Sequence, residues 1–495
     1  MRAGSGGSFE KFAPFLPVLL TMLLYFALAT PGVDPITTDW AMYAMHARNI
    51  ATGHAYADTF YVYQPEVAAT GGATYPSGYP LLLAPVYAIF GMKILAFKIV
   101  TDLALSLSLW PIYLFFRRYL GLAQSLLLTT ALGFSAAYLT LQDKLGSDAL
   151  YQLVSFATLV FVIRVFESGR DVSSPWRAGA LAGLLLAAVE ITRPVGLSLA
   201  FAVLAYDALN RRRPNRFAFA LLAAFIPVLV LNSLLAHKDS SYAEQFDFSI
   251  GHAAHNVVAY VAGFSDVFAN PFSHKLRYAL WAVFTPLAIF GFATSLRKVN
   301  PVPALYAALM LGVLAIYWTP NMRYLAPLYP IYLLFAALGW RRFMLATPAQ
   351  WKRPAQAAAI AGLLAAPLLS VAAIRPNPDT LITDPNFTQL VGYVRANAAP
   401  RDLIVFWNAR VLGLAADRPS SAYPSASPIY EDSSPEKVLR YLDRVRPSYV
   451  VLDGGFPQDE RYLAEAIAMA PARFNTVYQN ARFRLMQYQA NASAN

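Results

Sequence analysis

The sequence contains no cysteine, and only 14% of its 495 residues are charged. The absence of cysteine excludes disulfide bonds, thiolate nucleophiles and cysteine-ligated zinc. Soluble domains carry roughly a quarter of charged residues, so a chain with this composition and 57% hydrophobic residues is unlike a soluble enzyme. The sequence also lacks a Walker loop, a dinucleotide-binding fingerprint and a Gly-x-Ser-x-Gly elbow. Nucleotide-powered and serine-hydrolase mechanisms therefore have no motif to support them.

The chain has 39 basic and 28 acidic residues, which gives a net charge of +11. From Pro376 to the carboxyl terminus it carries 12 basic and 12 acidic residues, so all of the excess positive charge lies before that point. In a soluble chain this excess would suggest nucleic-acid binding. In an apolar chain it indicates the bias of basic residues towards the inner side of a membrane and contact with lipid headgroups. We therefore expect no nucleic-acid partner.

Apolar runs of about bilayer-spanning length recur from residue 13 to residue 374. They predict a polytopic α-helical membrane protein with about 11 transmembrane helices, its amino terminus inside and its carboxyl terminus outside. We expect the first run to stay as an uncleaved helix, because it is long for the apolar part of a signal peptide. The expected crossings cover residues 12–30, 94–116, 121–141, 147–166, 178–192, 194–209, 216–236, 277–296, 301–318, 324–340 and 355–374.

The least secure pair of crossings lies within residues 178–209, where each arm has roughly 15 residues rather than the roughly 20 that a span needs. Arg193-Pro194 at the turn between the arms indicates a water-filled cavity there. If residues 178–209 formed a single helix, every later crossing would have the opposite orientation in the membrane. The alternation of crossings puts the following basic residues on the inner side: Arg164, Arg170, Arg211, Arg212, Arg213, Arg216, Arg297, Lys298, Arg341, Arg342, Lys352 and Arg353.

The chain divides into a membrane domain over residues 1–375 and a smaller domain over residues 376–495. Two outer loops of the membrane domain, residues 32–93 and 237–276, form the expected active-site face. In the first loop we expect a helix over residues 39–51 and an apolar stretch over residues 79–90 that is too short to cross and either lies along the interface or re-enters the membrane. Beyond residue 375, strand-like and amphipathic runs alternate, which predicts an α/β domain outside the membrane. The strand-like runs are residues 403–407, 449–452 and 482–488, and the helical runs are residues 387–397, 435–445 and 459–470.

All six histidines lie in the two outer loops, together with many tyrosines and acidic residues, so we expect the chemistry to be outside. Asp39 stands out because it opens the expected helix, with Tyr43 and His46 on the same face. It can be the cap of that helix, with Thr37 and Thr38 as rival caps, or a functional carboxylate, and the two roles can coexist. At a water-excluded surface a carboxylate gains basicity by desolvation and can accept a proton from a hydroxyl nucleophile.

Arg193 and Arg323 are ionisable residues at membrane depth, and the sequence offers no neutralising partner for them beyond Glu190. Guanidinium groups near the outer leaflet are suited to bidentate capture of a phosphate. His252 and His255 have the i, i+3 spacing that permits metal ligation on a helix, but no acidic residue completes a recognisable metal site. We therefore expect no required cofactor or metal, with a divalent cation as the less favoured alternative.

Several segments carry a resemblance to a known family. They are residues 39–53 and 74–85 of the first outer loop with Phe90-Gly91, Ser147-Asp148-Ala149-Leu150, residues 191–197 and residues 323–328. These segments resemble the GT-C fold glycosyltransferases, in the bacterial branch that includes aminoarabinose transferases of lipid A and protein O-mannosyltransferases. The resemblance covers nearly the whole membrane part. The C-terminal domain is similar to the extracytoplasmic domain of some of these enzymes through Ala416-Asp417-Arg418-Pro419 and Tyr449-Val450-Val451-Leu452.

The resemblance implies transfer of a single sugar from a polyprenyl-phosphate carrier to a hydroxyl acceptor on the outer face of the membrane, with inversion at the anomeric carbon. Asp39 would be the catalytic base. The sequence departs from the family at Trp40, where many relatives carry a glutamate beside this aspartate. Asp148 falls at a position that is often acidic in the family, so it is a candidate for supporting the site or binding the acceptor.

The residue inventory agrees with that chemistry. Because negative charge grows on a lipid-phosphate leaving group, fixed cations beside it stabilise the transition state more than the ground state. The candidates for binding the donor phosphate are Arg193 and Arg323, with Lys144 and Lys275 behind them. Tyrosines of the first loop can stack on sugar faces and close over the site. The candidates for binding substrate are Tyr43, Tyr75, Tyr79, Asp148, His252 and His255.

We expect the protein in a bacterial inner membrane, with its site and its C-terminal domain facing the periplasm. Its expected partners are a polyprenyl-phosphate-linked sugar, the lipid bilayer and an acceptor that is a lipid glycan, a polysaccharide or a protein. One alternative is an en bloc ligase or polymerase that uses a polyprenyl-diphosphate oligosaccharide. Another is a transporter of a lipid-linked substrate, whose usual sign is a pair of pseudo-symmetric halves that this sequence lacks. A third is a scaffold or sensor without catalysis.

Overall fold

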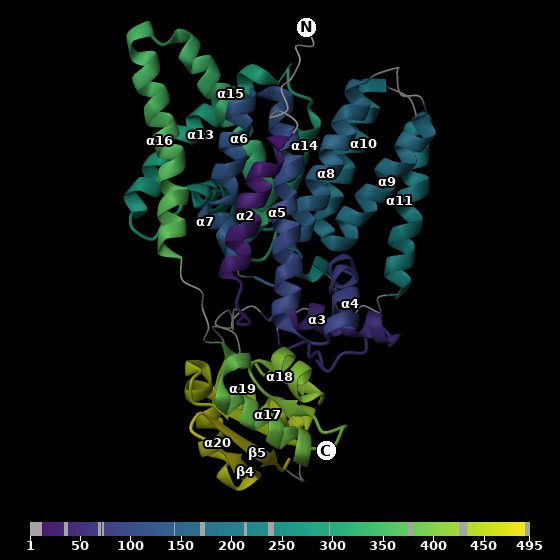
Figure 1. Ribbon diagram of the computed structural model, residues 1–495. Helices are drawn as coiled ribbons and strands as arrows, with labels where there is room; N and C mark the ends of the chain where they lie inside the picture. The colour runs from purple at the N-terminus through teal and green to yellow at the C-terminus, as the bar shows by residue number, and fades with distance from the viewer. Residues whose placement is uncertain are drawn as a thin grey trace.

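The computed structural model describes residues 12–33, 38–67, 71, 74–142, 144–168, 174–211, 215–235, 242–296, 298–374, 380–424 and 433–490. Figure 1 shows a bundle of long helices with a small α/β domain at one end. We call the end of the bundle next to this domain the outer end and the opposite end the inner end, after the orientation expected from the sequence. Thr37, Arg170, Arg212, Arg213, Arg297 and the expected domain boundary at residue 376 lie outside the described residues.

Each of the eleven segments expected to cross the membrane contains a helix or a bent pair of helices. They are α2 (Phe15–Leu28), α5 (Ile94–Tyr119), α6 (Leu122–Gly133) with α7 (Ala136–Gln142), α8 (Asp148–Glu167), α9 (Pro175–Thr192), α10 (Leu197–Arg211), α11 (Arg216–Leu235), α13 (His274–Ser295), α14 (Val302–Ala315), α15 (Tyr329–Ala346) and α16 (Ala349–Ala373). In the described part of the chain, six helices are long and apolar enough to cross a bilayer alone, and a seventh span exists if the pair α6 and α7, bent by 52°, counts as one. Eleven crossings therefore stay a prediction.

The apolar helices differ in how much of their surface the protein itself covers. In α5 and α8, 67% of the most apolar window is buried inside the protein, whereas the value is 22% for α11 and α16 and 11% for α13. A helix that is apolar all round yet exposed on most of its surface is typical of contact with lipid. The chain is a multi-pass membrane protein in which α5, α8 and the span Met322–Ala346, which is 72% buried and contains α15, lie nearest the centre, and α11, α13 and α16 lie at the periphery.

The chain breaks at Arg193, as the sequence predicts. Helix α9 ends at Thr192, and the short helix η3 (Pro194–Gly196) leads into α10. Arg193 itself is extended, with φ −153° and ψ 130°, because a residue before proline is driven away from helical geometry. The break places the Arg193 side chain at the outer end of the bundle rather than along a helix face.

Two helices of the first outer loop lie between the bundle and the C-terminal domain (Figure 1). They are α3 (Asp39–Thr52) and α4 (Gly78–Phe90), the latter matching the expected interfacial stretch. Gly78 allows α4 to approach the end of α9, because a Cβ atom at this position would lie 2.6 Å from the Thr192 hydroxyl oxygen. The second outer loop contributes η4 (Tyr242–Gln245) and α12 (Ile250–Gly263).

The C-terminal domain contains a five-stranded sheet of order β2-β1-β3-β5-β4. Strands β2 (Ser420–Ser421), β1 (Ile404–Val405) and β3 (Tyr449–Asp453) are parallel, and β5 (Phe483–Tyr488) and β4 (Phe474–Gln479) continue the sheet in antiparallel pairing. The helices of this domain are α17 (Pro385–Asn397), α18 (Ala409–Ala416), α19 (Pro435–Val445) and α20 (Ala464–Met469). Strands β2 and β4 and helix α18 are not predicted from the sequence, because they are short or only partly apolar.

The C-terminal sheet continues into the first outer loop. Tyr61 forms a parallel bridge with Ser420 of the edge strand β2. The Val62 N–H donates to the Ser420 carbonyl at 2.9 Å, and the Ser420 N–H donates to the Phe60 carbonyl at 2.8 Å. Arg48 of α3 also pairs with Asp417 of the domain at 3.1 Å. The domain is thus joined to the loop by backbone hydrogen bonds as well as by side chains.

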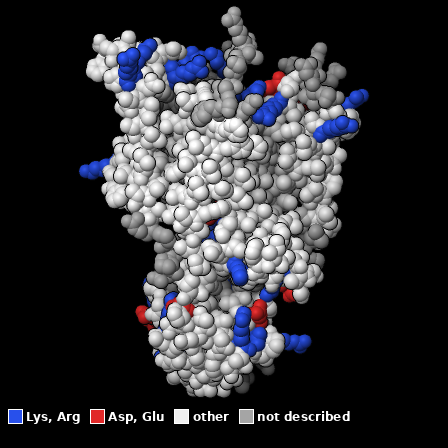
Figure 2. Space-filling model, viewed as in Figure 1, with Lys and Arg blue, Asp and Glu red and all other residues white. Residues whose placement is uncertain are grey.

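The charged residues on the visible face are unevenly distributed. Figure 2 shows lysines and arginines gathered at the inner end, a wide middle band with few charged residues, and side chains of both signs on the C-terminal domain. This distribution is typical of a membrane protein whose basic residues flank the inner ends of its helices.

Candidate active site

A cavity of about 450 Å³ opens at the outer end of the bundle. One side is polar and is formed by Asp39, Tyr43, Tyr75, Arg193 and Arg323. The other side is apolar and comes mainly from α10 and α14; it includes Leu197, Phe201, Leu309 and Val313. The cavity therefore joins a charged end to an apolar arm between two membrane helices.

The carboxylate of Asp39 is held by donors from three distant parts of the chain. Its Oδ1 accepts hydrogen bonds from the Tyr75 hydroxyl at 2.6 Å and from Arg410 Nη1 at 3.2 Å. Its Oδ2 accepts one from Arg323 Nη2 at 3.2 Å. Tyr75 precedes α4, Arg410 lies on α18, and Arg323 lies on η6 (Met322–Leu328), just before α15. Asp39 is 284 residues from Arg323 and 371 residues from Arg410 in the sequence, so only the fold brings them together.

Two expectations for Asp39 are wrong. The N-cap of α3 is Thr38, which makes no side-chain capping bond, and Asp39 is the first helical residue, so its carboxylate does not act as the cap. Burial by itself would raise the pKa of the Asp39 carboxyl, but the guanidinium groups of Arg323 and Arg410 and the Tyr75 hydroxyl outweigh it, so the pKa is lowered below its ordinary value. Asp39 is therefore held ionised, because these donors more than cancel the rise in pKa that burial causes.

The two membrane arginines have neutralising partners that the sequence analysis did not foresee. Arg193 pairs with Asp148, which opens α8, and Arg323 pairs with Asp39. Both guanidinium groups also lie over the Tyr324 ring, at 4.9 Å and 5.3 Å from its centroid. The buried Nε of Arg323 donates no hydrogen bond to any residue in the described part of the chain. These pairings connect residues 45 and 284 positions apart, which local spacing does not reveal.

Asp148, Arg193 and Lys144 also line a narrower recess that opens beside Asp39. Tyr43 borders both this recess and the main cavity, and its hydroxyl lies 3.1 Å from the Ser147 hydroxyl. The fold therefore gathers most of the expected site residues. They are Asp39, Tyr43, Tyr75, Lys144, Asp148, Arg193 and Arg323.

The other expected site residues lie apart from these cavity linings. Tyr79 is buried behind Tyr43, and its hydroxyl lies 2.6 Å from that of Thr101. His252 packs behind the cavity wall, with Nε2 2.8 Å from the Tyr317 carbonyl oxygen. The remaining two, His255 on α12 and Lys275 on α13, are exposed. The described residues contain no group of three His, Asp or Glu side chains that could hold a metal ion.

Arg410 is the site residue that the sequence analysis missed. It comes from the C-terminal domain, is only 6% exposed, and contacts the Asp39 carboxylate directly. Its one signal in the sequence is an arginine in an otherwise apolar eight-residue helix, Ala409–Ala416. That signal indicates a buried charge but not its partner.

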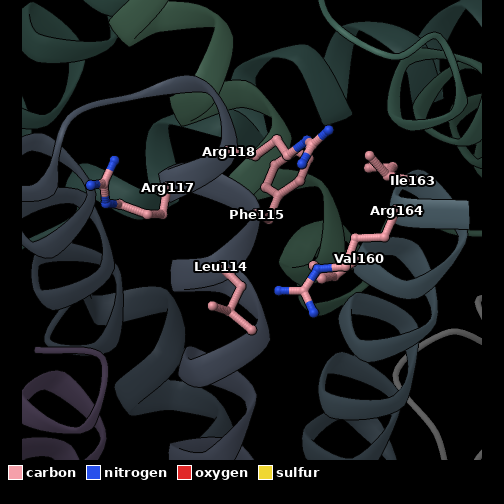
Figure 3. A pocket seen from close by; sticks show the side chains of 7 residues that line it. All are labelled: Leu114, Phe115, Arg117, Arg118, Val160, Ile163 and Arg164. Atoms are coloured by element: carbon pink, nitrogen blue, oxygen red, sulfur yellow. The ribbon is translucent and has the colours of Figure 1, made fainter. Parts of the chain in front are cut away.

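A second cavity, of about 190 Å³, lies at the inner end of the bundle between α5 and α8. Figure 3 shows its arginines, Arg117, Arg118 and Arg164, around apolar side chains that include Phe115 and Val160. All three arginines are exposed, and Arg118 pairs with Glu167. Each arginine lies in the last turn of its helix, where a cation is stabilised by the helix dipole. Their positions in the last turns of helices, at the end of the bundle expected to face inwards, account for these arginines.

Comparison with solved structures shows the class of fold. The chain is similar to ArnT from Cupriavidus metallidurans bound to undecaprenyl phosphate, with 12% identity, a TM-score of 0.62, and coverage of 97% of this chain and 98% of that one. It is similar to the oligosaccharyltransferase AglB from Archaeoglobus fulgidus in complex with an inhibitory peptide and a dolichol-phosphate, with 11% identity, a TM-score of 0.59, and coverage of 98% and 75%. It is also similar to the arabinofuranosyltransferase AftD from Mycobacteria, with 15% identity, a TM-score of 0.56, and coverage of 98% and 40%.

These likenesses confirm that the protein has the GT-C fold, a polytopic helical bundle, here with an α/β domain at its outer end. The chain belongs to the family described as predicted membrane protein (DUF2079), whose model matches residues 37–399. Among curated proteins there is no significant match.

Proposed function

We propose that the protein is a membrane glycosyltransferase that moves one sugar from a polyprenyl-phosphate carrier to a hydroxyl acceptor, with inversion at the anomeric carbon. One observation carries the proposal. A single cavity joins an ionised carboxylate, two arginines and an apolar arm between membrane helices. Those are the three features that such a reaction requires: a proton acceptor, a site for a phosphate and a place for a hydrocarbon chain.

Arg193 and Arg323 are the proposed ligands of the donor phosphate, with Lys144 next to them. The Nε of Arg323 is a buried donor without an acceptor in the described part of the chain, and leaving such a group unpaired costs stability. A phosphate oxygen would satisfy it. As the bond between the anomeric carbon and the phosphate oxygen breaks, its electron pair moves to the phosphate, and the two fixed guanidinium groups stabilise that charge.

The apolar arm is the proposed place of the carrier's hydrocarbon chain. Phe201 on α10 and Leu309 on α14 line this arm and are 59% and 40% exposed. Both residues lie on apolar helices of the bundle, so we expect the lipid bilayer to be the medium in contact with them. A prenyl chain could then enter sideways from the membrane while its phosphate reaches the arginines.

Asp39 is the proposed base. The acceptor hydroxyl oxygen attacks the anomeric carbon from the face opposite the phosphate, and its proton passes to the Asp39 carboxylate. Because Asp39 is a weak base in this setting, proton transfer follows the build-up of positive charge on the hydroxyl rather than preceding it. Tyr43 and Tyr75 border the same space and offer ring faces and edges to a sugar.

We further propose that the protein lies in a bacterial inner membrane with its site on the periplasmic side. The support is the gathering of basic residues at the end of the bundle away from the C-terminal domain (Figure 2). No nucleotide sugar would act as the direct donor.

Lipid binding by the purified protein tests the proposal. Native mass spectrometry would compare undecaprenyl phosphate with undecaprenyl diphosphate at equal concentration. Preferential binding of the monophosphate is expected. Preference for the diphosphate would favour an en bloc ligase, and lack of binding to either lipid would favour a transporter or scaffold. Incorporation of sugar from a nucleotide sugar without any lipid carrier would contradict the proposed donor.

A further inference from the structure

Arg410 connects the C-terminal domain to the centre of the candidate site. Its Nη1 donates to the Tyr75 hydroxyl at 2.6 Å, to Asp39 Oδ1 at 3.2 Å and to the Thr38 hydroxyl at 3.3 Å. Its guanidinium also lies over the rings of Tyr61 and Tyr75, at 4.9 Å and 5.3 Å. A guanidinium with several directed hydrogen bonds and two aromatic neighbours has one geometry, so it fixes the groups that it contacts.

The position of α18, and with it Arg410, is set by backbone contacts. The bridge between Tyr61 and Ser420 extends the sheet of the C-terminal domain into the first outer loop. Gly413, one turn after Arg410, lies against this same loop, because a Cβ atom at position 413 would be 3.1 Å from the Phe60 carbonyl oxygen. The close packing at Gly413 and the backbone bridge hold the helix against the loop that carries Asp39.

We propose that Arg410 is a positioning residue of the active site, which holds Asp39 and Tyr75 in the geometry for transfer and so makes the C-terminal domain an integral part of that site. The role of Arg410 in positioning groups for sugar transfer rests on the proposed function. The contact between Arg410 and Asp39, and the effect of that contact on the Asp39 carboxylate, are independent of the proposed function.

The charges around Asp39 explain why Arg410 matters. Arg323 and Arg410 donate to the carboxylate from opposite parts of the fold, and Tyr75 donates to the same oxygen as Arg410. The other ionisable groups that line the two cavities at Asp39 are Tyr43, Lys144, Asp148, Arg193, Tyr317 and Tyr324. Of these, Asp148 is engaged by Arg193. Without Arg410, Arg323 would be the remaining cation paired with Asp39 among the described residues. It would then be drawn towards the carboxylate and away from a phosphate.

A chemical titration of Asp39 tests this inference without any sugar donor. A hydrophobic carbodiimide reacts with protonated carboxyl groups, so its yield at Asp39, measured by peptide mass spectrometry across a pH series, reports the protonation of that residue. Loss of one of two cations hydrogen-bonded to a carboxylate shifts its midpoint upwards by about one pH unit, which corresponds to roughly tenfold more labelling at a fixed pH above the midpoint. Arg410→Gln is expected to produce that shift.

Matched variants separate positioning from docking. Arg48→Gln removes another arginine of the same interface, which pairs with Asp417 rather than Asp39, and is expected to leave the Asp39 midpoint unchanged. Arg410→Lys keeps the charge and is expected to restore most of the wild-type midpoint. Hydrogen exchange at the Val62 amide, which bonds to Ser420, reports whether the domain stays docked in each variant.

Two results would overturn the inference. One is an Asp39 midpoint in Arg410→Gln equal to that in Arg48→Gln. The other is a shift in Arg410→Gln that comes with loss of protection at the Val62 amide, because undocking of the domain rather than loss of the guanidinium would then explain the shift. Binding of undecaprenyl phosphate, measured on the same samples, keeps failure of the proposed function separate from failure of this inference.

Discussion

The inner and outer ends of the helical bundle both gather arginines, but they hold them differently. At the outer end, the side chains of Arg193 and Arg323 are only 14% and 16% exposed and pair with carboxylates far away in the sequence. At the inner end, Arg118 is 45% exposed and pairs with Glu167 at the end of a neighbouring helix, and Arg164 is also exposed. Burying a charge costs free energy unless partners compensate. Burial and long-range pairing therefore distinguish a candidate site from a rim of charge.

The largest expected effect comes from removing the carboxylate at the outer end. Asp39→Asn leaves no proton acceptor for the acceptor hydroxyl, so transfer from a polyprenyl-phosphate-linked sugar should fall by about 10²–10⁴-fold. The assay is the rate of sugar transfer by protein in lipid nanodiscs. The control is Asp417→Asn, which removes the carboxylate of the C-terminal domain that pairs with Arg48 of α3. This variant should keep activity within about threefold of wild type, because ion pairs exposed to solvent contribute little free energy. Equal rates for Asp39→Asn and wild type would remove the proposed base.

The second effect compares arginines at the two ends directly. Arg193→Gln or Arg323→Gln should weaken undecaprenyl phosphate binding by about 10–100-fold, because a hydrogen bond to a charged group contributes about 1.5–3 kcal/mol. Arg164→Gln changes net charge by the same amount at the inner end and should alter binding by less than about twofold. Native mass spectrometry or lipid competition measures all three. Similar losses for Arg164→Gln and Arg323→Gln would mean that overall charge, not the outer cavity, governs binding.

The third effect is the response of the outer end to pH. The pKa of Asp39 is lowered, so the carboxylate should stay ionised down to a pH below its ordinary value of about 3.9. Titration of Asp39 should therefore not change the rate of sugar transfer between about pH 5 and 8, and the rate should decline through protonation of Asp39 only below about pH 4. The free energy of unfolding should depend on pH in the same direction. Because the pKa of Asp39 is lower in the folded than in the unfolded protein, this residue stabilises the folded state at pH values above its unfolded-state pKa. That stabilisation is lost as pH falls through the folded-state pKa. A fall in the transfer rate with a midpoint near pH 6 that is absent in Asp39→Asn would contradict the lowered pKa.

The sequence predicts the helical segments better than it predicts the site. Long apolar runs and basic flanks indicate where helices lie, because hydrophobicity and charge act locally. Asp39, Arg193 and Arg323 could be chosen as unusual charges in an apolar chain. Their partners could not, because the contacts with Asp148 and Arg410 depend on how the helices and the C-terminal domain meet. The cap reading of Asp39, one of those left open, is wrong for the same reason: long-range ion pairs engage the carboxylate that a local rule would place at the helix end.

The smallest expected effect lies in the C-terminal domain, at a buried carboxyl that is not paired with a cation in the described residues. Burial raises the pKa of Asp459 to about 8, although the Tyr423 hydroxyl and the Asp453 backbone N–H donate to it. The unfolded chain ionises this group near pH 3.9, so stability should fall as pH rises from about 4 to 8. Asp459→Asn mimics the neutral acid, so the melting temperature of the variant minus that of wild type should be a few degrees higher at pH 8 than at pH 5. An identical pH dependence in the variant and wild type would contradict the raised pKa.

The most direct test of the account is to locate a bound carrier lipid. Undecaprenyl phosphate with a photoreactive group on its hydrocarbon chain would be crosslinked to the wild-type protein in nanodiscs, and the modified peptides would be mapped by mass spectrometry. The account predicts labelling of α10 and α14 around Phe201 and Leu309, reduced in Arg193→Gln and unchanged in Arg164→Gln. Labelling concentrated on α5 and α8 around the inner arginines, or labelling of α10 and α14 that is indifferent to Arg193, would contradict it.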